Sequence, residues 1–295
     1  MSGEAYLSLN RFLRERFGER VQKIPLDAGL GCPHRLTDGS GGCIFCDGNG
    51  SGTGAWRRGM TIREQMKRGI KWGLRRYKAR KYMAYFQSWS NTFASPEKLR
   101  ALYSEALEDE RVVALAIGTR PDCVDRKRLD VIAEVAKDRM VWLEYGLQSA
   151  SDKSLDMLNR GHTVEDFANA AKLTRTYGFM ICAHIIFGIP GETRSDMLGT
   201  TDFLRQHAVN GVKFHQLFAV RGTRLHRMYQ EKMFFPISFE DYVDVTAAAI
   251  RRLGGDTVVH RLSGDPPPGE IAVPEWSLDK RRIAAAIHDR LGKTP

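Results

Sequence analysis

The feature that most constrains this chain is a regular alternation of short apolar runs with helical segments. The runs are largely apolar and lie at residues 21–26, 83–86, 112–117, 140–147, 180–187 and 212–217. Helices capped by Ser95 and Thr163 are predicted between them, with Pro96 at a first helical position. Buried strands that alternate with helices form a parallel sheet covered by helices. We therefore expect an α/β fold, a partial (β/α)6 barrel of the TIM type with working loops after its strands.

The chain is long enough to bury a sizeable core, since it has 295 residues of which 42% are hydrophobic. We expect three parts, an N-terminal helix over 1–20, the barrel core over 21–234 and a C-terminal helical extension over 235–295. No apolar run approaches the ~18 residues of a membrane span, and the start lacks the apolar region of a secretory signal. Five cysteines, three of them clustered, argue against a disulfide framework. These features predict a cytoplasmic protein with no membrane partner.

A glycine-rich loop over residues 29–54 holds three cysteines, Cys32, Cys43 and Cys46. Nine glycines and few apolar residues make this loop unable to bury a core, so its thiolates are candidate metal ligands. One interpretation is a structural zinc site that His34 completes, although no second CxxC is present. The other is a [4Fe–4S] cluster held by three thiolates, which leaves one iron open to an outside ligand. The remaining cysteines are remote from the loop.

The motif GCPHR, followed by GGCIFCD with an aromatic residue before the last cysteine, resembles the signature of radical S-adenosylmethionine (SAM) enzymes. Their usual pattern is CxxxCxxC, and the longer first spacing here resembles a subgroup that includes the catalytic subunit of Elongator. The YhcC-like group is similar over nearly the whole chain. This resemblance implies that the three cysteines bind a [4Fe–4S] cluster and that SAM chelates the fourth iron. It also implies reductive cleavage of SAM to a 5′-deoxyadenosyl radical, fed by an electron donor such as flavodoxin or ferredoxin.

The same resemblance implies SAM contacts from loops that follow the predicted strands. The residues concerned are Gln87 and Ser88 in QSWSNT, Asp122 in GTRPD, Gln148 in EYGLQS, Arg160 in NRGH, Gly188 in FGIPGET and Val220 in VRGT. The QSWSNT loop lacks the glycines typical of the family, so its assignment is positional. An ion pair with Arg120 is the alternative role for Asp122. We expect a structural role for His162 and core or barrel-lining positions for His184 and His215, without a role in substrate binding.

The positive charge of the chain is concentrated in residues 57–82, which carry eleven lysines and arginines against one acid. The total charge is +10, so the rest of the chain is balanced. Apolar residues at helical spacing predict one buried stripe over 61–80, made of Ile62, Met66, Ile70, Leu74 and Tyr77. Basic residues run alongside it at Lys67, Lys71, Arg75 and Lys78. The candidate nucleic-acid contacts on this segment are Lys67, Lys71, Arg75 and Arg76.

Tryptophans and tyrosines interleave with these bases, which suits phosphate contacts combined with base stacking. Relatives of the Elongator type act on the wobble uridine of tRNA, so the resemblance implies a tRNA substrate. A solvated basic surface is the simplest alternative. Two others are a radical SAM enzyme for a small molecule or protein, whose basic helix binds an acidic flavodoxin, and a zinc-stabilised RNA-binding protein without catalysis.

Overall fold

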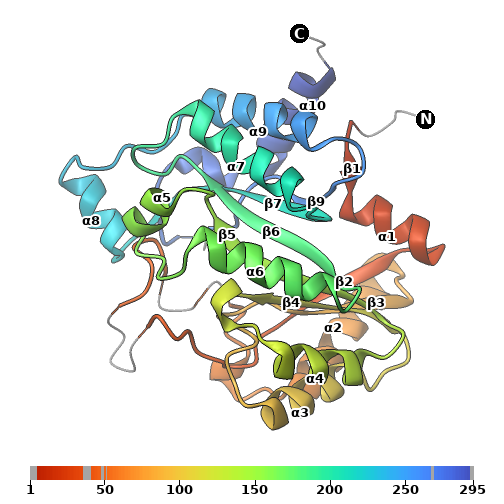
Figure 1. The fold of residues 1–295 in the computed structure, drawn as a ribbon. Coiled ribbons are helices and arrows are strands. Elements are labelled where there is room, and N and C mark those ends of the chain that lie inside the picture. Colours follow the sequence, from red (N-terminus) through yellow and green to blue (C-terminus); the bar gives the residue numbers. More distant parts are fainter. Residues whose placement is uncertain (1–4, 36–40, 48–49, 51, 267–268, 293–295) are drawn as a thin grey trace.

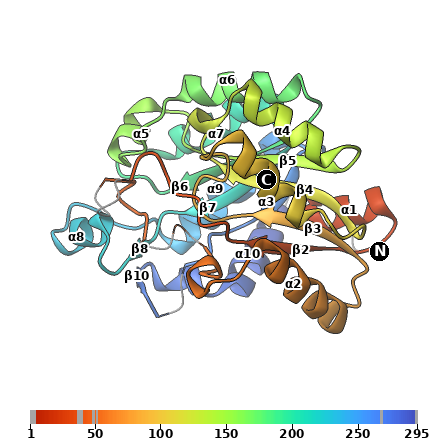
Figure 2. The same ribbon diagram turned by 90° about the horizontal axis from the view of Figure 1, so that it is seen from below.

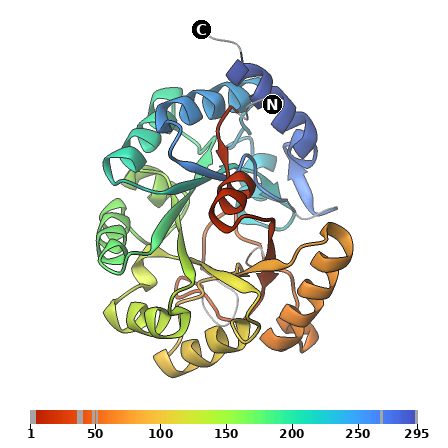
Figure 3. The same ribbon diagram turned by 90° about the vertical axis from the view of Figure 1, so that its right-hand side faces the viewer.

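An eight-stranded parallel sheet forms the centre of the protein, and a computed structural model describes it over residues 5–35, 41–47, 50, 52–266 and 269–292. The strand order is β1-β9-β7-β6-β5-β4-β3-β2, and the sheet curls into an open barrel (Figures 1 and 3). The main strands are β2 (Val21–Leu26), β3 (Lys81–Phe86), β4 (Val112–Thr119), β5 (Met140–Gln148), β6 (Met180–Phe187) and β7 (Gly211–Gln216). These six strands match the predicted apolar runs, so the expected partial barrel is confirmed.

Helices cover the outside of the barrel and return the chain between parallel strands (Figure 3). They are α2 (Ile62–Tyr77), α3 (Pro96–Ala106), α4 (Arg126–Ala136), α6 (Val164–Arg175) and α7 (Arg194–Gln206). The side chain of Thr163 accepts the Asp166 amide and the Asp166 carboxylate accepts the Thr163 amide, a capping box that starts α6. Between strands and helices lies one large core, in which Phe86, Leu143 and Phe214 are fully buried.

The amino-terminal end of the barrel is closed by α1 (Leu9–Phe17), which follows the short strand β1 (Leu7–Ser8). Leu13 packs there with Trp142 and Met83 in a second buried cluster. The Phe12 ring meets the edge of Trp142 at 5.8 Å between centroids. Helix α1 lies in front of the barrel axis in Figure 3. Ligands of the barrel therefore approach from the other end or from its open side.

The segment after the sixth strand carries more than the expected helices. It contains α8 (Arg224–Gln230), α9 (Phe239–Leu253) and α10 (Lys280–Gly292), but also the strand β9 (Val258–Arg261). Strand β9 extends the sheet between β7 and β1. A separate two-stranded sheet pairs β8 (Ala219–Val220) with β10 (Ile271–Val273). The expectation of a purely helical extension therefore missed its strands, because β9 has only four residues.

Candidate functional site

A cavity of about 210 Å³ lies inside the barrel, between the cysteine loop and the inner faces of the strands. A second cavity of about 720 Å³ shares Phe45, Cys46, Gln148 and His215 with the first, so the two are adjacent. Both lie toward the carboxyl ends of the strands, where barrel enzymes place their active sites. A third cavity of about 770 Å³ reaches Lys213 and Tyr85 from the side, between β2 and β9.

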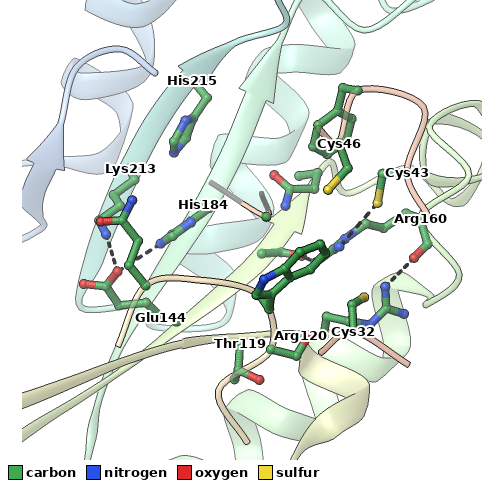
Figure 4. A pocket seen from close by; sticks show the side chains of 18 of the residues that line it. Cys32, Cys43, Cys46, Thr119, Arg120, Glu144, Arg160, His184, Lys213 and His215 are labelled. Carbon is green, nitrogen blue, oxygen red and sulfur yellow. Dashed lines mark hydrogen bonds and ion pairs between the residues drawn. The ribbon is translucent and has the colours of Figure 1, made fainter. Parts of the chain in front are cut away.

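The three cysteines of the loop face the first cavity (Figure 4). The amide of Ile44, which lies between Cys43 and Cys46, donates to the Leu158 carbonyl at 3.0 Å. The Ile44 carbonyl accepts the amide of Leu225 at 2.9 Å. The loop is thereby fixed between α5 (Asp152–Met157) and α8, which lie at the same end of the barrel (Figures 1 and 2).

The three thiols of the loop line one cavity, as the ligands of a single cluster must. Burial, followed by the neighbouring Cys43 and Asp47, raises the pKa of the Cys46 thiol to about 12. Thiols with this environment become ligands only when a cation compensates the thiolate charge. His34 does not join them, because its Nε2 lies 2.7 Å from the Asn159 carbonyl oxygen. The zinc alternative thus lacks the fourth ligand that the sequence suggested.

The segment 159–162 forms the wall beside the cysteines. The Arg160 guanidinium contacts the Cys43 sulfur at 3.5 Å, the Gly146 carbonyl at 3.0 Å and the His162 Nε2 at 2.9 Å. Burial lowers the pKa of His162 to about 4, and the Arg160 charge adds to the effect. His162 is therefore neutral near pH 7 and positions Arg160, in line with its expected structural role.

Arg120 connects this wall to the next loop. Its guanidinium donates to the Arg160 carbonyl at 2.7 Å and to the Gly161 carbonyl at 2.9 Å. It also forms a two-point ion pair with Asp122, at 2.9 and 2.8 Å. The Arg120 side chain is 3% exposed and the Asp122 side chain 27% exposed, so the pair lies at the edge of the buried region. The Asp122 carboxylate is already engaged, and its contact with SAM stays a prediction.

The remaining predicted SAM residues divide into two groups. Gln87, Gln148 and Arg160 line the first cavity, and Val220 lines the second. Ser88, Asp122 and Gly188 are not among the described residues that line these two cavities. Ser88 is fully buried, while Gly188 has φ of +87° and lies so close to Ile237 that an added Cβ would approach it to 2.8 Å. A packing role therefore explains Gly188, and the SAM roles of all these residues stay predictions.

Charged and aromatic side chains from five strands meet in the cavity, on the far side from the cysteines (Figure 4). We call this set the inner cluster. Its members are Lys23, Tyr85, Glu144, His184, Lys213 and His215 on β2, β3, β5, β6 and β7. The sequence predicted core or barrel-lining positions for the two histidines, which is correct, but no role for Glu144 and Lys213 and no cluster. The available signal was a charged residue inside each otherwise apolar strand.

Glu144 lies at the centre of the inner cluster and is fully buried. One carboxylate oxygen contacts the Lys213 ammonium and the His184 Nε2, the latter at 3.1 Å. The other lies 3.4 Å from Lys23 and 3.4 Å from the His260 Nδ1. Burial alone would raise the pKa of Glu144, but Lys213 and Lys23 hold it well below its usual value. The carboxylate is therefore ionised and fixes the surrounding cations.

Comparison with known protein families agrees with this geometry. Residues 29–204 match the family described as the radical SAM superfamily, and residues 209–293 match the radical SAM C-terminal domain. The chain belongs to the radical SAM superfamily. Protein YhcC of Escherichia coli is 35% identical over 267 residues, which cover 90% of this chain and 85% of YhcC. The chain thus falls in a YhcC/Elongator-like group of radical SAM enzymes, and its cofactors are a [4Fe–4S] cluster and SAM.

Two further similarities concern larger proteins. The solved structure of Elp3 from Methanocaldococcus infernus has a TM-score of 0.72 at 18% identity. The match covers 92% of this radical SAM chain and 63% of the Elp3 chain, so it shows the shared fold. A tRNA uridine(34) acetyltransferase of Methanocaldococcus infernus is 29% identical over 146 residues, which are 47% of this chain and 26% of that protein.

Helix α2 of this radical SAM enzyme presents its basic residues to solvent. Lys67, Lys71, Arg75 and Arg76 are exposed, and Trp72 between them is 51% exposed. The opposite face packs on β2, where an added Cβ at Gly69 would approach Ile24 to 2.4 Å. The predicted buried stripe is correct at Ile62, Met66 and Ile70. It is wrong at Leu74, which is 45% exposed because the glycines bring a different face of the helix onto the sheet.

No helix in the described part of the chain has the length and apolar character needed to cross a membrane.

Proposed function

We propose that this radical SAM enzyme modifies tRNA, with the side chain of the wobble uridine as its target. The observation that carries the proposal is the exposed cationic face of α2 beside the open side of the barrel. Helices α2 (orange) and α10 (dark blue) lie on either side of this opening (Figure 3). The third cavity enters there and reaches Tyr85 and Lys213. A nucleic acid held by α2 is therefore close to an entrance of the reaction cavity.

The cofactors occupy the opposite wall of the same cavity in this proposal. Cys32, Cys43 and Cys46 hold the [4Fe–4S] cluster, which together with SAM supplies the radical chemistry. Arg160 and Gln148 bind and orient SAM, since both face the cavity next to the cysteines. Arg160 offers a planar pair of donors that matches the methionine carboxylate. His162 and Arg120 keep this guanidinium and its backbone in place.

The chemistry of α2 supports a polyanion with unstacked bases as the partner. Exposed Lys and Arg side chains neutralise phosphates and release counterions, while Trp72 and Trp56, both more than half exposed, offer stacking surfaces. Arg63 on the same helix is paired with Glu108, so the pair leaves the Lys67, Lys71, Arg75 and Arg76 side of α2 to the ligand. The local similarity to a tRNA uridine(34) acetyltransferase supports the same substrate class.

Binding of purified tRNA at different salt concentrations tests the proposal. The variant with Lys67, Lys71, Arg75 and Arg76 changed to Glu should bind at least tenfold more weakly at ~50 mM salt, with a shallower dependence on salt. A matched control changes four exposed lysines on or next to the outer helices α3, α4 and α6 to Glu: Lys98, Lys127, Lys137 and Lys172. Equal affinity of the two variants, or no binding by the unchanged protein, would exclude tRNA as the ligand of α2.

An electron donor is the second candidate partner of α2. The chemistry of the superfamily needs one electron per SAM cleavage, and an acidic flavodoxin or ferredoxin complements the positive charge of the helix. If the α2 variant loses flavodoxin-dependent SAM cleavage but keeps tRNA binding, α2 is the donor site. If it loses tRNA binding and keeps SAM cleavage with the same donor, the tRNA proposal stands.

A further inference from the structure

The inner end of the cavity carries more positive than negative side chains. Four cations surround it together with two carboxylates, and they are Lys23, Lys213, Arg261 and Lys280 against Glu144 and Asp265. Each carboxylate already contacts two of these cations. Lys213 is only 3% exposed, so its charge is weakly screened by water, whereas Lys280 at the rim is 55% exposed. Such a site attracts an anion.

The same end of the cavity also holds buried donors that lack partners. His215 Nε2 is buried and forms no hydrogen bond with any described residue, and neither does Gln216 Nε2. His215 lines both cavities, and its ring lies 5.6 Å from that of His184 (Figure 4). Buried polar atoms without partners cost about 1–3 kcal/mol, so a ligand that supplies acceptors is favoured here.

This place is separate from the site expected for SAM. Along β5, four residues separate Glu144 from Gln148, about 13 Å at ~3.3 Å per residue. Gln148 and the cysteines lie at the mouth of the barrel, while Glu144 marks its inner end. Lys213 aligns through His184 with Gly146, two positions before Gln148 on β5, whereas His215 faces both cavities together with Gln148. A molecule bound between Lys213 and Glu144 therefore lies deeper in the barrel than Gln148.

We propose that the inner cluster binds a carboxylate group of the substrate, with Lys213 and His215 as the donors that select it. The proposal rests on the proposed function only in taking this cavity as the reaction chamber. A carboxylate has two oxygens and one charge, which match two neighbouring donors. A phosphate brings a further oxygen and up to a second charge. The carboxylate belongs either to a modified nucleoside of tRNA or to a free small acid.

The electrostatics of Lys213 and His184 agree with this assignment. Burial lowers the pKa of Lys213 to about 7, although Glu144 acts in the opposite direction. Burial, and then Lys213, lowers the pKa of His184 to about 4. An added carboxylate favours the protonated form of both side chains. The anion therefore favours the ammonium form of Lys213, which also donates to the Tyr85 hydroxyl at 2.8 Å.

Acetate is the probe for this site, and the histidine rings report on it. The cluster-containing protein, saturated with SAM and labelled with ¹⁵N at its histidines, is titrated with acetate against chloride at equal ionic strength. We expect saturable changes in the ring signals of His184 and His215 with a midpoint in the millimolar range. The signals of His207 and His288, which lie outside the cavity, should stay in place. No saturable change, or equal changes in all four rings, would overturn the proposal.

Two cavity variants test Lys213 and His215 as the donors to the carboxylate and are chosen so that the protein still folds. His215→Phe removes an unpartnered donor and should weaken acetate binding at least fivefold. The double variant Lys213→Met with Glu144→Gln removes both charges of a buried pair, so it avoids the uncompensated carboxylate that Lys213→Met alone would leave. It should abolish the response of His215, whereas Lys172→Met on the outer face of α6 should not change it. Acetate binding unchanged in both cavity variants would refute the assignment of the donors.

SAM and tRNA identify the source of the carboxylate. If SAM abolishes the acetate response, the site holds the methionine carboxylate of SAM and the proposal is overturned. If tRNA from cells that lack this protein produces the same ring changes and blocks acetate, the carboxylate is on the nucleoside. If acetate still binds beside tRNA, the acid is free. If tRNA does not bind at all while acetate does, the tRNA function fails and the carboxylate site stands.

Discussion

The two ends of the reaction cavity are built in opposite ways. At the mouth, loops are joined through backbone carbonyls, as where His34 meets Asn159 and where Arg120 meets Arg160. At the inner cluster, side chains meet directly because strand register fixes them, and His184 is the direct neighbour of Lys213 across β6 and β7. The mouth is therefore built from loops, whereas the inner cluster is held in place by the sheet and has more cations than carboxylates around it. Changes at the mouth should therefore affect cofactor retention, and changes inside should affect stability.

The largest effect is expected for the cysteines at the mouth. Changing Cys43 to Ala should reduce iron from ~4 per chain to near zero after anaerobic reconstitution, since three thiolates are the minimum for a SAM-binding cluster. The measurement is iron and sulfide per chain together with visible absorbance. Cys182→Ala is the control, because this thiol is fully buried in the lower core and away from the cavity. Full iron retention in the Cys43 variant would remove the loop from the cluster site.

Inside the barrel the largest effect is expected for Glu144. Glu144→Ala leaves Lys213 buried without its carboxylate, which should lower the free energy of unfolding by about 3–5 kcal/mol. Chemical denaturation checks the value. The matched control is Glu134→Ala, which breaks an exposed ion pair with Arg100 at 2.7 Å and should cost less than about 1 kcal/mol. Similar losses in the two variants would show that the inner cluster is hydrated and not rigid.

Buried histidines at both ends of the cavity should make the stability of the folded protein fall at acidic pH. Burial lowers the pKa to about 4 for His162 and His184 and to about 3 for His260, and His215 also lies well below its usual value. Histidines in the unfolded chain have a pKa of about 6.5, so the unfolded chain binds more protons than the folded protein as the pH falls from about 6.5 toward 4. This proton binding favours the unfolded state. The folded protein should lose up to about 1.4 kcal/mol per pH unit for each such histidine.

Denaturation midpoints measured between pH 7 and pH 5 test this relation. His215→Phe should reduce the slope of stability against pH by up to one proton, because it removes one neutral buried imidazole. His288→Gln changes an exposed histidine on α10 and should leave the slope as it is. A slope that does not respond to His215→Phe would mean that this ring is already protonated in the folded protein.

The same contrast explains how much could be predicted from the sequence. The mouth was recognisable because its candidate ligands stand in short motifs, with Cys43 and Cys46 in one motif and Arg160 in NRGH, which follows α5. The inner cluster was not, because Lys23, Glu144 and Lys213 are far apart in the chain and meet only through strand order. A single charged residue in an apolar strand does not reveal its partner.

Secondary structure was likewise predictable where the signal lies within one short stretch of the sequence. Strands with six or more apolar or alternating residues, such as β6, were found with their ends nearly correct. The four residues of β9 gave no such signal, since this short strand is held between its neighbours β7 and β1. Leu74 was misplaced for a related reason, because Gly69 and Gly73 decide which face of α2 approaches the sheet. The spacing of apolar residues does not show that a glycine, which has no side chain, lets that face of the helix approach the sheet.

The smallest expected effect concerns the contact between the cysteine loop and its wall. Gly161 has φ of +68°, and a Cβ there would lie 2.5 Å from the His34 Nδ1. Gly178 has nearly the same φ, +69°, with no atom within 4 Å of an added Cβ. Gly178→Ala should therefore cost only the backbone term of about 1 kcal/mol, and Gly161→Ala about 1–2 kcal/mol more. Because His34 would be displaced, the Gly161→Ala protein should also retain less iron after reconstitution. Equal stability and equal iron content in the two variants would show that the cysteine loop is held without this contact.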